Sequence, residues 1–327
     1  MGLAFVLAGL GIVALPGVLR PLGRCLAPSD WARLITVALV GGFAVFELGL
    51  VFYAAPTVLS ASGAFGLAAL CLHMLGGVAP GGAAAGWAAG VLAVVVAASS
   101  ALALGRARRV RRRARVERCI GEHAPLGRHE LVVLPRDELV AFSVEGQGGQ
   151  VVVSSGLVAA LYPDELVAVL AHEAAHLDHR HQRYLSVASV VRHGLAFFPP
   201  AERSARALVV ALERWADEVA VGALEHGRDR LRSALRQVTA SVVGLEVAAF
   251  SPADTIAERL DALDEPPAGL DLRRLGLLYS PGFALGVAAV AGLGMWASNL
   301  EMLVQMAGRC PLWPGSDQGA VTTVCRR

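Results

Sequence analysis

The chain alternates between long apolar stretches and one charged stretch. Apolar residues dominate before residue 105 and again after residue 280, and the region between them carries most of the charge. Three segments, residues 2–19, 34–55 and 83–104, are long and apolar enough to cross a bilayer, which takes about 20 residues. A fourth, residues 281–306, follows the charged region. The pattern predicts a membrane protein with one polar domain inserted between its spans.

Arginine residues predict the orientation of these spans. The run RARRVRRRAR, residues 106–115, directly follows the third apolar segment, and Arg20, Arg24 and Arg33 lie between the first two. Membrane proteins keep an excess of positive residues on the cytoplasmic side, so both groups are expected inside. The N-terminus is then outside and the polar domain is cytoplasmic. We expect the arginine run to anchor the chain at lipid headgroups rather than to bind nucleic acid.

This orientation defines four regions of a multi-pass protein of the plasma membrane. Residues 1–104 form the N-terminal membrane region, residues 105–275 a cytoplasmic domain, residues 281–306 the last span and residues 307–327 a short external tail. Residues 64–78 are too short for a span and end in glycines, so we interpret them as a re-entrant or interfacial segment. Counting them as a fifth span would move the arginines between the first two spans to the outside.

Composition refines this picture in three respects. The chain has 327 residues, of which 55% are hydrophobic, and its net charge of +2 gives no reason to expect a nucleic-acid partner. Five cysteines without a CxxC pair argue against a disulfide scaffold and a thiolate zinc site, although Cys310 and Cys325 could pair in the external tail. Glu47 lies within the second span, where we interpret it as a neutral carboxylic acid bonded to a neighbouring helix.

The polar domain begins with short strands and continues as helices. Residues 130–135, 139–144 and 150–154 have the composition of strands, and the glycine-rich turn before the third predicts a hairpin. A helix is predicted to begin at Pro163, with acidic residues in its first turn. We therefore expect an α-helical integral membrane protein with an inserted, mainly helical α+β domain that carries a small β-sheet.

The helix predicted from Pro163 carries the sequence HEAAH. His172 and His176 are four residues apart, so their imidazoles share one face of the helix and can reach a single zinc ion. Glu173 lies beside this face, where it could take a proton from a water molecule. The rest of the helix is strongly apolar, which favours a buried pair over a surface helix with scattered histidines.

A catalytic zinc site needs a third protein ligand. Glu213 in the sequence LERWAD is the preferred candidate, because a second helix crossing the first could deliver its carboxylate, and His179 is an alternative. Asp217 lies one turn after Glu213 and could hold the second nitrogen of a metal-binding histidine. If His179 is not a ligand, it is predicted to lie near solvent together with Arg180 and His181.

These motifs resemble a known group of enzymes. HEAAH followed by ERWAD resembles the HExxH…ExxAD arrangement of the gluzincin metallopeptidases, and AFSVEGQGGQVVVSSGLVAAL before the helix resembles HtpX-type and CAAX prenyl proteases. The layout of spans and polar domain resembles the BlaR/MecR-type antirepressor metallopeptidases. The resemblance implies a gluzincin metallopeptidase domain with Zn2+ as cofactor. It also implies the site residues, with Glu173 as the base, Asp217 as support, and His172, His176 and Glu213 as ligands.

Two departures from these groups matter. Only residues 307–327 follow the last span, which is too few for the external sensor domain of BlaR/MecR-type proteins. Ser251 stands where HtpX-type proteins have the histidine of a His-Pro pair. Arg259 matches a later arginine of that pattern and is expected to pair with an acid near the site.

The resemblance implies a membrane-embedded zinc endopeptidase that hydrolyses peptide bonds of a cytoplasmic protein, with a winged-helix transcriptional repressor as one candidate substrate. Two alternatives stay open, namely an HtpX-like quality-control protease of membrane proteins and a non-catalytic zinc-containing membrane receptor. A homo-oligomer also stays open. The substrate is expected to pair as an extended strand with a sheet edge. The candidate edges are Ala141, Phe142, Ser143 and Val144, or alternatively residues 151–153.

Overall fold

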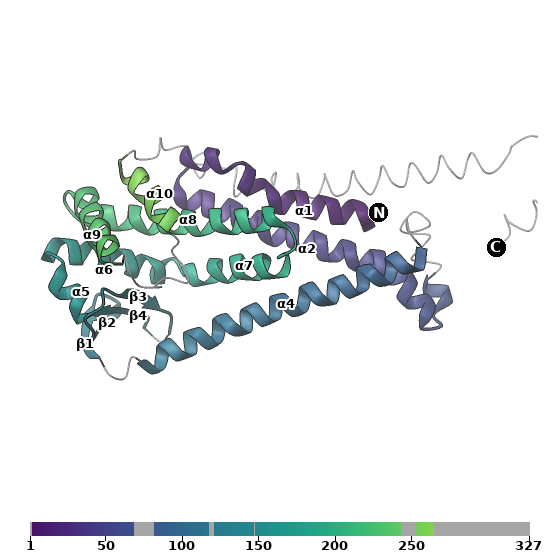
Figure 1. The fold of residues 1–327 in the computed structure, drawn as a ribbon, viewed down its shortest axis with the longest axis horizontal. Helices are drawn as coiled ribbons and strands as arrows, with labels where there is room; N and C mark the ends of the chain where they lie inside the picture. Colours follow the sequence, from purple (N-terminus) through teal and green to yellow (C-terminus); the bar gives the residue numbers. More distant parts are fainter. Residues whose placement is uncertain (1, 69–81, 118–120, 147, 243–252, 265–327) are drawn as a thin grey trace, which may run out of the picture.

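The computed structural model describes residues 2–68, 82–117, 121–146, 148–242 and 253–264. The molecule is elongated, with a small β-sheet and several helices at one end and long helices running away from them (Figure 1). The predicted last span and external tail, both cysteines of the tail and Ser251 lie outside the described residues, as does most of the segment 64–78.

The three N-terminal apolar segments all form helices. These are α1 (Gly2–Val18), α2 (Pro28–Ala61) and α4 (Gly82–Glu117), and the short 3-10 helix η1 (Arg20–Arg24) joins the first two. By length and composition, α2 and the apolar part of α4 are long enough to cross a membrane, whereas α1 is shorter. Only 33% and 17% of their most apolar windows are buried inside the protein, so most of these apolar residues face outward. This suggests membrane association.

Helices α1 and α2 cross with their backbones in close contact. A Cβ atom on Gly9 would lie 2.4 Å from the backbone nitrogen of Phe46, and one on Gly42 would lie 2.9 Å from the carbonyl oxygen of Gly9. About two turns further along α2, a Cβ atom on Gly49 would lie 2.7 Å from the backbone nitrogen of Val6. Glycine is therefore required for the close approach, as is common where helices pack in membranes.

The sheet has four strands in the order β1-β2-β4-β3. The strands are β1 (Glu122–Leu126), β2 (His129–Leu134), β3 (Ala141–Val144) and β4 (Gln150–Ser154). The predicted hairpin is confirmed, because β3 and β4 pair antiparallel, while β2 and β4 pair parallel. Strand β1 was not predicted from the sequence; it pairs antiparallel with β2 and is almost entirely exposed.

The strand order decides between the two candidate edges for a substrate. Among the described strands, β3 is the last of the sheet and pairs with β4 on one side only. β4 lies between β2 and β3, so its backbone groups are already paired on both sides. The alternative edge at residues 151–153 is therefore wrong, and the edge at residues 141–144 is the one that the fold leaves at the border of the sheet.

Six helices complete the described fold. They are α5 (Ser155–Ala160), α6 (Pro163–Asp178), α7 (His181–Gly194), α8 (Pro199–Gly222), α9 (Gly227–Val242) and α10 (Ala253–Asp264). Helix α6 begins at Pro163, as predicted, and the Tyr162 backbone N–H donates to the Glu165 carboxylate at its first turn. One side of α6 packs on the sheet through Leu166, Val169 and Leu177, and α8 crosses its other side.

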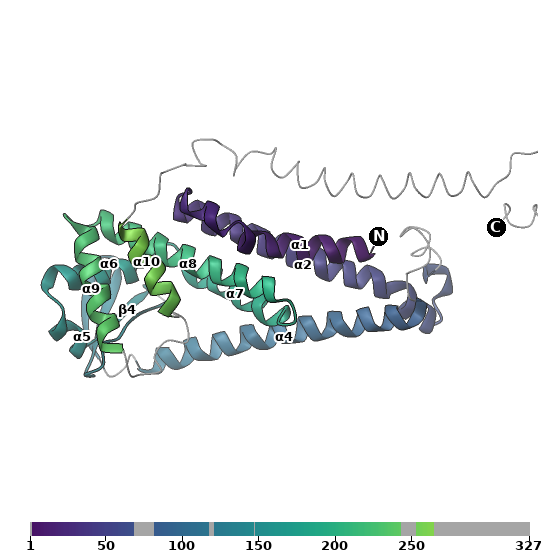
Figure 2. The same ribbon diagram turned by 45° about the horizontal axis from the view of Figure 1, so that its top comes forward.

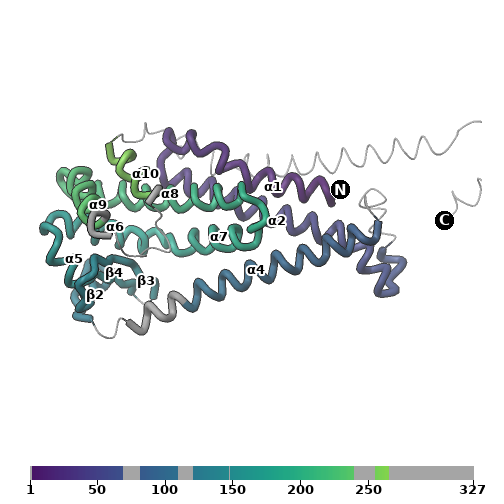
Figure 3. Tube along the Cα trace, in the orientation of Figure 1, coloured from purple at the N-terminus to yellow at the C-terminus, as the bar shows by residue number. Residues whose placement is uncertain are grey.

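Helices α7 and α8 form a hairpin that lies between α1 and α2 on one side and α4 on the other (Figures 2 and 3). Near the tip of the hairpin, the Phe197 ring lies 6.2 Å from the ring of Phe46 on α2. Further along α8, the Ser204 hydroxyl accepts a hydrogen bond of 2.9 Å from the Gly17 backbone N–H. The apolar helices and the hairpin of α7 and α8 therefore share one hydrophobic core.

The connection between α1 and α2 lies beside the second half of α8. The Arg33 guanidinium lies 5.0 Å from the centre of the Trp215 ring, and Arg214 donates to the carbonyl oxygen of Gly23. Arg20 forms an ion pair with Glu258 on α10. Arg20 and Arg33 thus lie near α10 and near the second half of α8, respectively.

Candidate metal centre

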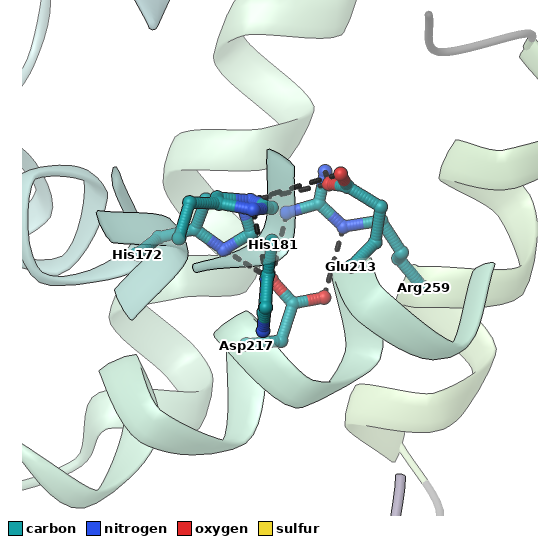
Figure 4. Close-up of polar contacts among 6 residues, drawn as sticks. His172, His181, Glu213, Asp217 and Arg259 are labelled. Atoms are coloured by element: carbon teal, nitrogen blue, oxygen red, sulfur yellow. Dashed lines mark hydrogen bonds and ion pairs between the residues drawn. The ribbon is translucent and has the colours of Figure 1, made fainter. Parts of the chain in front are cut away.

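The crossing of α6 and α8 brings three potential ligand atoms together (Figure 4). The Nε2 atoms of His172 and His176 are 3.1 Å apart. The Glu213 carboxylate approaches the same two nitrogens, at 3.5 Å from His172 and 3.7 Å from His176. Ligand atoms bound tetrahedrally to zinc at ~2.0–2.1 Å lie about 3.3 Å from one another. The donor set and its spacing therefore fit one zinc ion.

The charges around these atoms favour a cation. Asp217 is buried, the Glu213 side chain is 15% exposed, and both carboxylates contact the guanidinium of Arg259, which is only 7% exposed. Arg259 donates to both carboxylate oxygens of Asp217, at 2.9 and 2.7 Å, and lies 3.2 Å from Glu213. Two carboxylates facing one guanidinium leave a net negative charge, which a divalent metal ion would neutralise.

The pKa values of the site follow from this balance. Burial and the charge of Arg259 disfavour a second proton on His172, but its contacts with Asp217 and Glu213 prevail and raise its pKa to about 9. Burial would raise the pKa of Glu213, but the contact with His172 and the charges of His176 and Arg259 lower it overall. The site therefore holds an ionised carboxylate and attracts positive charge.

The second nitrogen of each converging imidazole also has a neighbour. His172 Nδ1 lies 2.9 Å from Asp217 Oδ1, the position predicted for Asp217. His176 Nδ1 lies 2.9 Å from His181 Nδ1, a neighbour that was not predicted. Both contacts leave the Nε2 atoms directed toward the common point.

The expectation that His181 lies near solvent is wrong, because the residue is 0% exposed. Helix α6 ends at Asp178, and Arg180 adopts a left-handed conformation with φ 54 before α7 begins. This turn brings His181 back against the face of α6 that carries His176. Burial is also the main reason why the pKa of His181 falls to about 3. Five residues separate the two histidines, which on a continuous helix would place them on different faces.

The other predicted residues take distinct places. Glu173 follows His172 on α6, is partly buried, and acts electrostatically on His176 and Arg259. The His179 ring packs 4.6 Å from the centre of the Trp215 ring and is not part of the converging set, so the alternative of His179 as third ligand loses its basis. Strand β3, with Ala141, Phe142, Ser143 and Val144, packs against α6 at the border of the sheet.

Comparison with known protein families gives a match within the polar domain. Residues 106–266 match the sequence model of peptidase family M48, and this range includes the sheet, α6, α8 and α10. The match supports a metallopeptidase domain of that family, whose members are generally zinc-dependent. The match does not show whether the chain belongs to the BlaR/MecR-type group that the sequence resembles. No curated protein sequence matches the chain.

Proposed function

We propose that this protein is a membrane-embedded zinc endopeptidase that hydrolyses peptide bonds of a cytoplasmic protein. The observation that carries the proposal is the convergence of His172, His176 and Glu213 on one point within the part of the chain that matches family M48. The partly buried Glu173 next to these residues favours catalysis over a purely structural site, because a structural zinc site needs no base.

The residues of the site divide the chemistry among them. His172 and His176 on α6 and Glu213 on α8 would hold the zinc ion, which supplies a Lewis acid and makes water nucleophilic near neutral pH. Glu173 accepts the proton of the attacking water and passes it to the leaving amine. Asp217 holds the His172 ring, and Arg259 neutralises the carboxylates behind it.

The substrate backbone is proposed to pair with β3 as an added strand. Residues 141–144 form one of the two borders of the sheet in the described part of the chain, and this border packs on the helix that carries His172. An extended peptide on β3 would be bound mainly through its backbone, which gives weak selectivity for sequence. The choice of substrate protein would then depend on which chains can reach β3 in an extended form, rather than on their sequence.

Two substrate classes remain as proposals, and one contact bears on the choice. A soluble repressor follows from the resemblance to the BlaR/MecR-type group. The second candidate is a membrane protein, as in HtpX-like quality control. It is supported by the contact of Arg33, near the start of α2, with Trp215 on α8, two residues after Glu213. A centre next to the ends of apolar helices is well placed for chains that emerge from a bilayer.

The test compares wild type with Glu173→Gln, which keeps the shape of the side chain and removes the base. We expect hydrolysis to fall by at least about 100-fold while zinc content stays at one ion per chain. Glu225→Gln, at an exposed position outside the site, serves as the matched control and should change neither quantity. Equal hydrolysis by Glu173→Gln and wild type would refute the catalytic proposal.

A second experiment identifies the substrate class. Membrane and soluble fractions of cells producing wild type are compared by mass spectrometry with those of cells producing Glu173→Gln. Fragments that depend on wild type in the soluble fraction support a repressor-like substrate. Fragments that arise from membrane proteins support quality control. If neither class of fragment is found although the protein binds zinc, the receptor alternative is supported.

A further inference from the structure

The two imidazoles that converge on the proposed metal position have unlike neighbours behind them. Behind His172 stands an ionised carboxylate, Asp217, which comes from α8 and is itself held by Arg259. Behind His176 stands a second imidazole, His181, with its Nδ1 atom 2.9 Å from Nδ1 of His176. The function proposed above assigns no task to His181.

The geometry defines how the proton between these two rings must lie. His176 Nε2 points to His172 Nε2 and Glu213, so its lone pair is the one available to a metal ion. A neutral imidazole carries one proton, and that proton must then sit on Nδ1 of His176. A donor at 2.9 Å needs an acceptor, so His181 must present the bare nitrogen of its own neutral ring.

The surroundings of His181 keep its ring in this position. The residue is 0% exposed, and its ring lies 4.8 Å from the Trp215 ring and 5.9 Å from the His179 ring. Among the described residues, His181 Nε2 has no hydrogen-bond partner. Packing against Trp215, rather than a second hydrogen bond, therefore determines where His181 Nδ1 points.

We propose that His181 is a positioning residue for the metal centre: its Nδ1 accepts a hydrogen bond from Nδ1–H of His176 and so directs Nε2 of His176 toward the zinc ion. Its effect is on metal affinity, because a ligand whose ring is already oriented loses less rotational freedom on binding. The inference rests on the proposed zinc site but does not depend on hydrolysis.

The test uses two substitutions that differ in one property. His181→Leu places an apolar side chain of similar size next to Trp215 and removes the acceptor. His181→Asn places Oδ1 at the same number of bonds from the backbone as the histidine Nδ1, so it can still accept from His176. The dissociation constant for Zn2+ is measured on the full-length chain in detergent by competition with a chelator.

We expect His181→Leu to bind Zn2+ about 10–100-fold more weakly than wild type, and His181→Asn to stay within about 3-fold of it. The Co2+-substituted proteins give a second readout, because the visible absorption of Co2+ reports ligand geometry. Its spectrum should change in His181→Leu and be restored in His181→Asn. Thermal unfolding of the metal-free proteins records any loss of packing separately.

The outcomes are distinguishable. Unchanged Zn2+ affinity in His181→Leu would overturn the inference, and so would an equal loss in both variants, because packing alone would then explain the effect. Rescue by asparagine supports it. A wild-type protein that binds Zn2+, shows the asparagine rescue and hydrolyses no peptide bond would leave this inference standing and refute the proposed function.

Discussion

The α1–α2 contact is buried and the metal centre is partly buried, and the two are packed in opposite ways. At the crossing, side chains are missing, so that Gly9 and Gly42 allow two helix backbones to touch. At the centre, charged side chains are present and compensate one another, as Arg259 does for Asp217 and Glu213. The first region should therefore be sensitive to added volume, and the second to a lost charge at constant volume.

The largest expected effect is on the centre. Arg259→Met keeps most of the side-chain volume and removes the guanidinium that contacts both Asp217 and Glu213. We expect the free energy of unfolding of the metal-free protein to fall by about 3–5 kcal/mol, the usual loss when one partner of a buried pair is removed. Chemical unfolding in detergent, followed by tryptophan fluorescence, measures this change.

A surface pair on α8, the helix that carries Glu213 and Asp217, provides the control for that variant. Arg206 contacts Glu202 one turn away on α8, and its side chain is 59% exposed. Arg206→Met should lower the free energy of unfolding by no more than about 0.5 kcal/mol, because water screens the pair. Comparable losses in the two variants would mean that Arg259 acts through the length of its side chain and not through its charge.

The second effect is on the crossing. Gly9→Leu places a side chain where the nearest atoms, at 2.4 and 2.7 Å, belong to the backbone of α2 and cannot turn aside. We expect a loss of about 1–3 kcal/mol in the free energy of unfolding, with unchanged Zn2+ affinity. Gly11→Leu is the matched control, because a Cβ atom there meets nothing within 4 Å. If both variants were equally stable, the close contact of α1 and α2 would be wrong.

The two regions also differ in how far the sequence alone predicts them. The spacing of His172 and His176 is local, so one helix is enough to bring their imidazoles together, and Glu213 needs only a second helix that crosses it. The contact of Gly9 with Phe46 depends on which helices pack together and on how they are shifted along their axes relative to each other. Glycines spaced along an apolar helix do not carry that information.

Within the centre itself, the prediction failed where the chain leaves regular structure. His181 reaches His176 because α6 ends at Asp178 and Arg180 turns left-handed, a conformation that arginine does not favour. Strand β1 was missed for a similar reason, since its residues are exposed and include Pro125, so the alternation of a half-buried strand is absent. In neither case does the hydrophobic pattern along the chain indicate the contact that forms.

The contacts of Asp178, outside both regions, give the smallest expected effect and test the role of burial. The Asp178 carboxylate lies 2.5 Å from His129 Nε2 and accepts a hydrogen bond of 2.8 Å from Arg128, with 30% of its side chain exposed. Burial would raise the pKa of Asp178, but these two contacts lower it. The pairing is therefore of the same kind as at Asp217, but solvent reaches it.

A pKa that is lower in the folded than in the unfolded protein stabilises the fold above the unfolded value of about 3.9. That stability is lost as the pH falls through the folded pKa. Asp178→Asn should therefore lower the free energy of unfolding by about 0.5 kcal/mol at neutral pH, and the difference from wild type should vanish on acidification. Chemical unfolding of both proteins across a pH series measures it, with Glu225→Gln, at an exposed position, as the reference. If the difference in unfolding free energy between the variant and wild type grew in acid, the contacts with His129 and Arg128 would not favour the ionised carboxylate. Charge compensation would then stabilise this protein only where solvent is excluded.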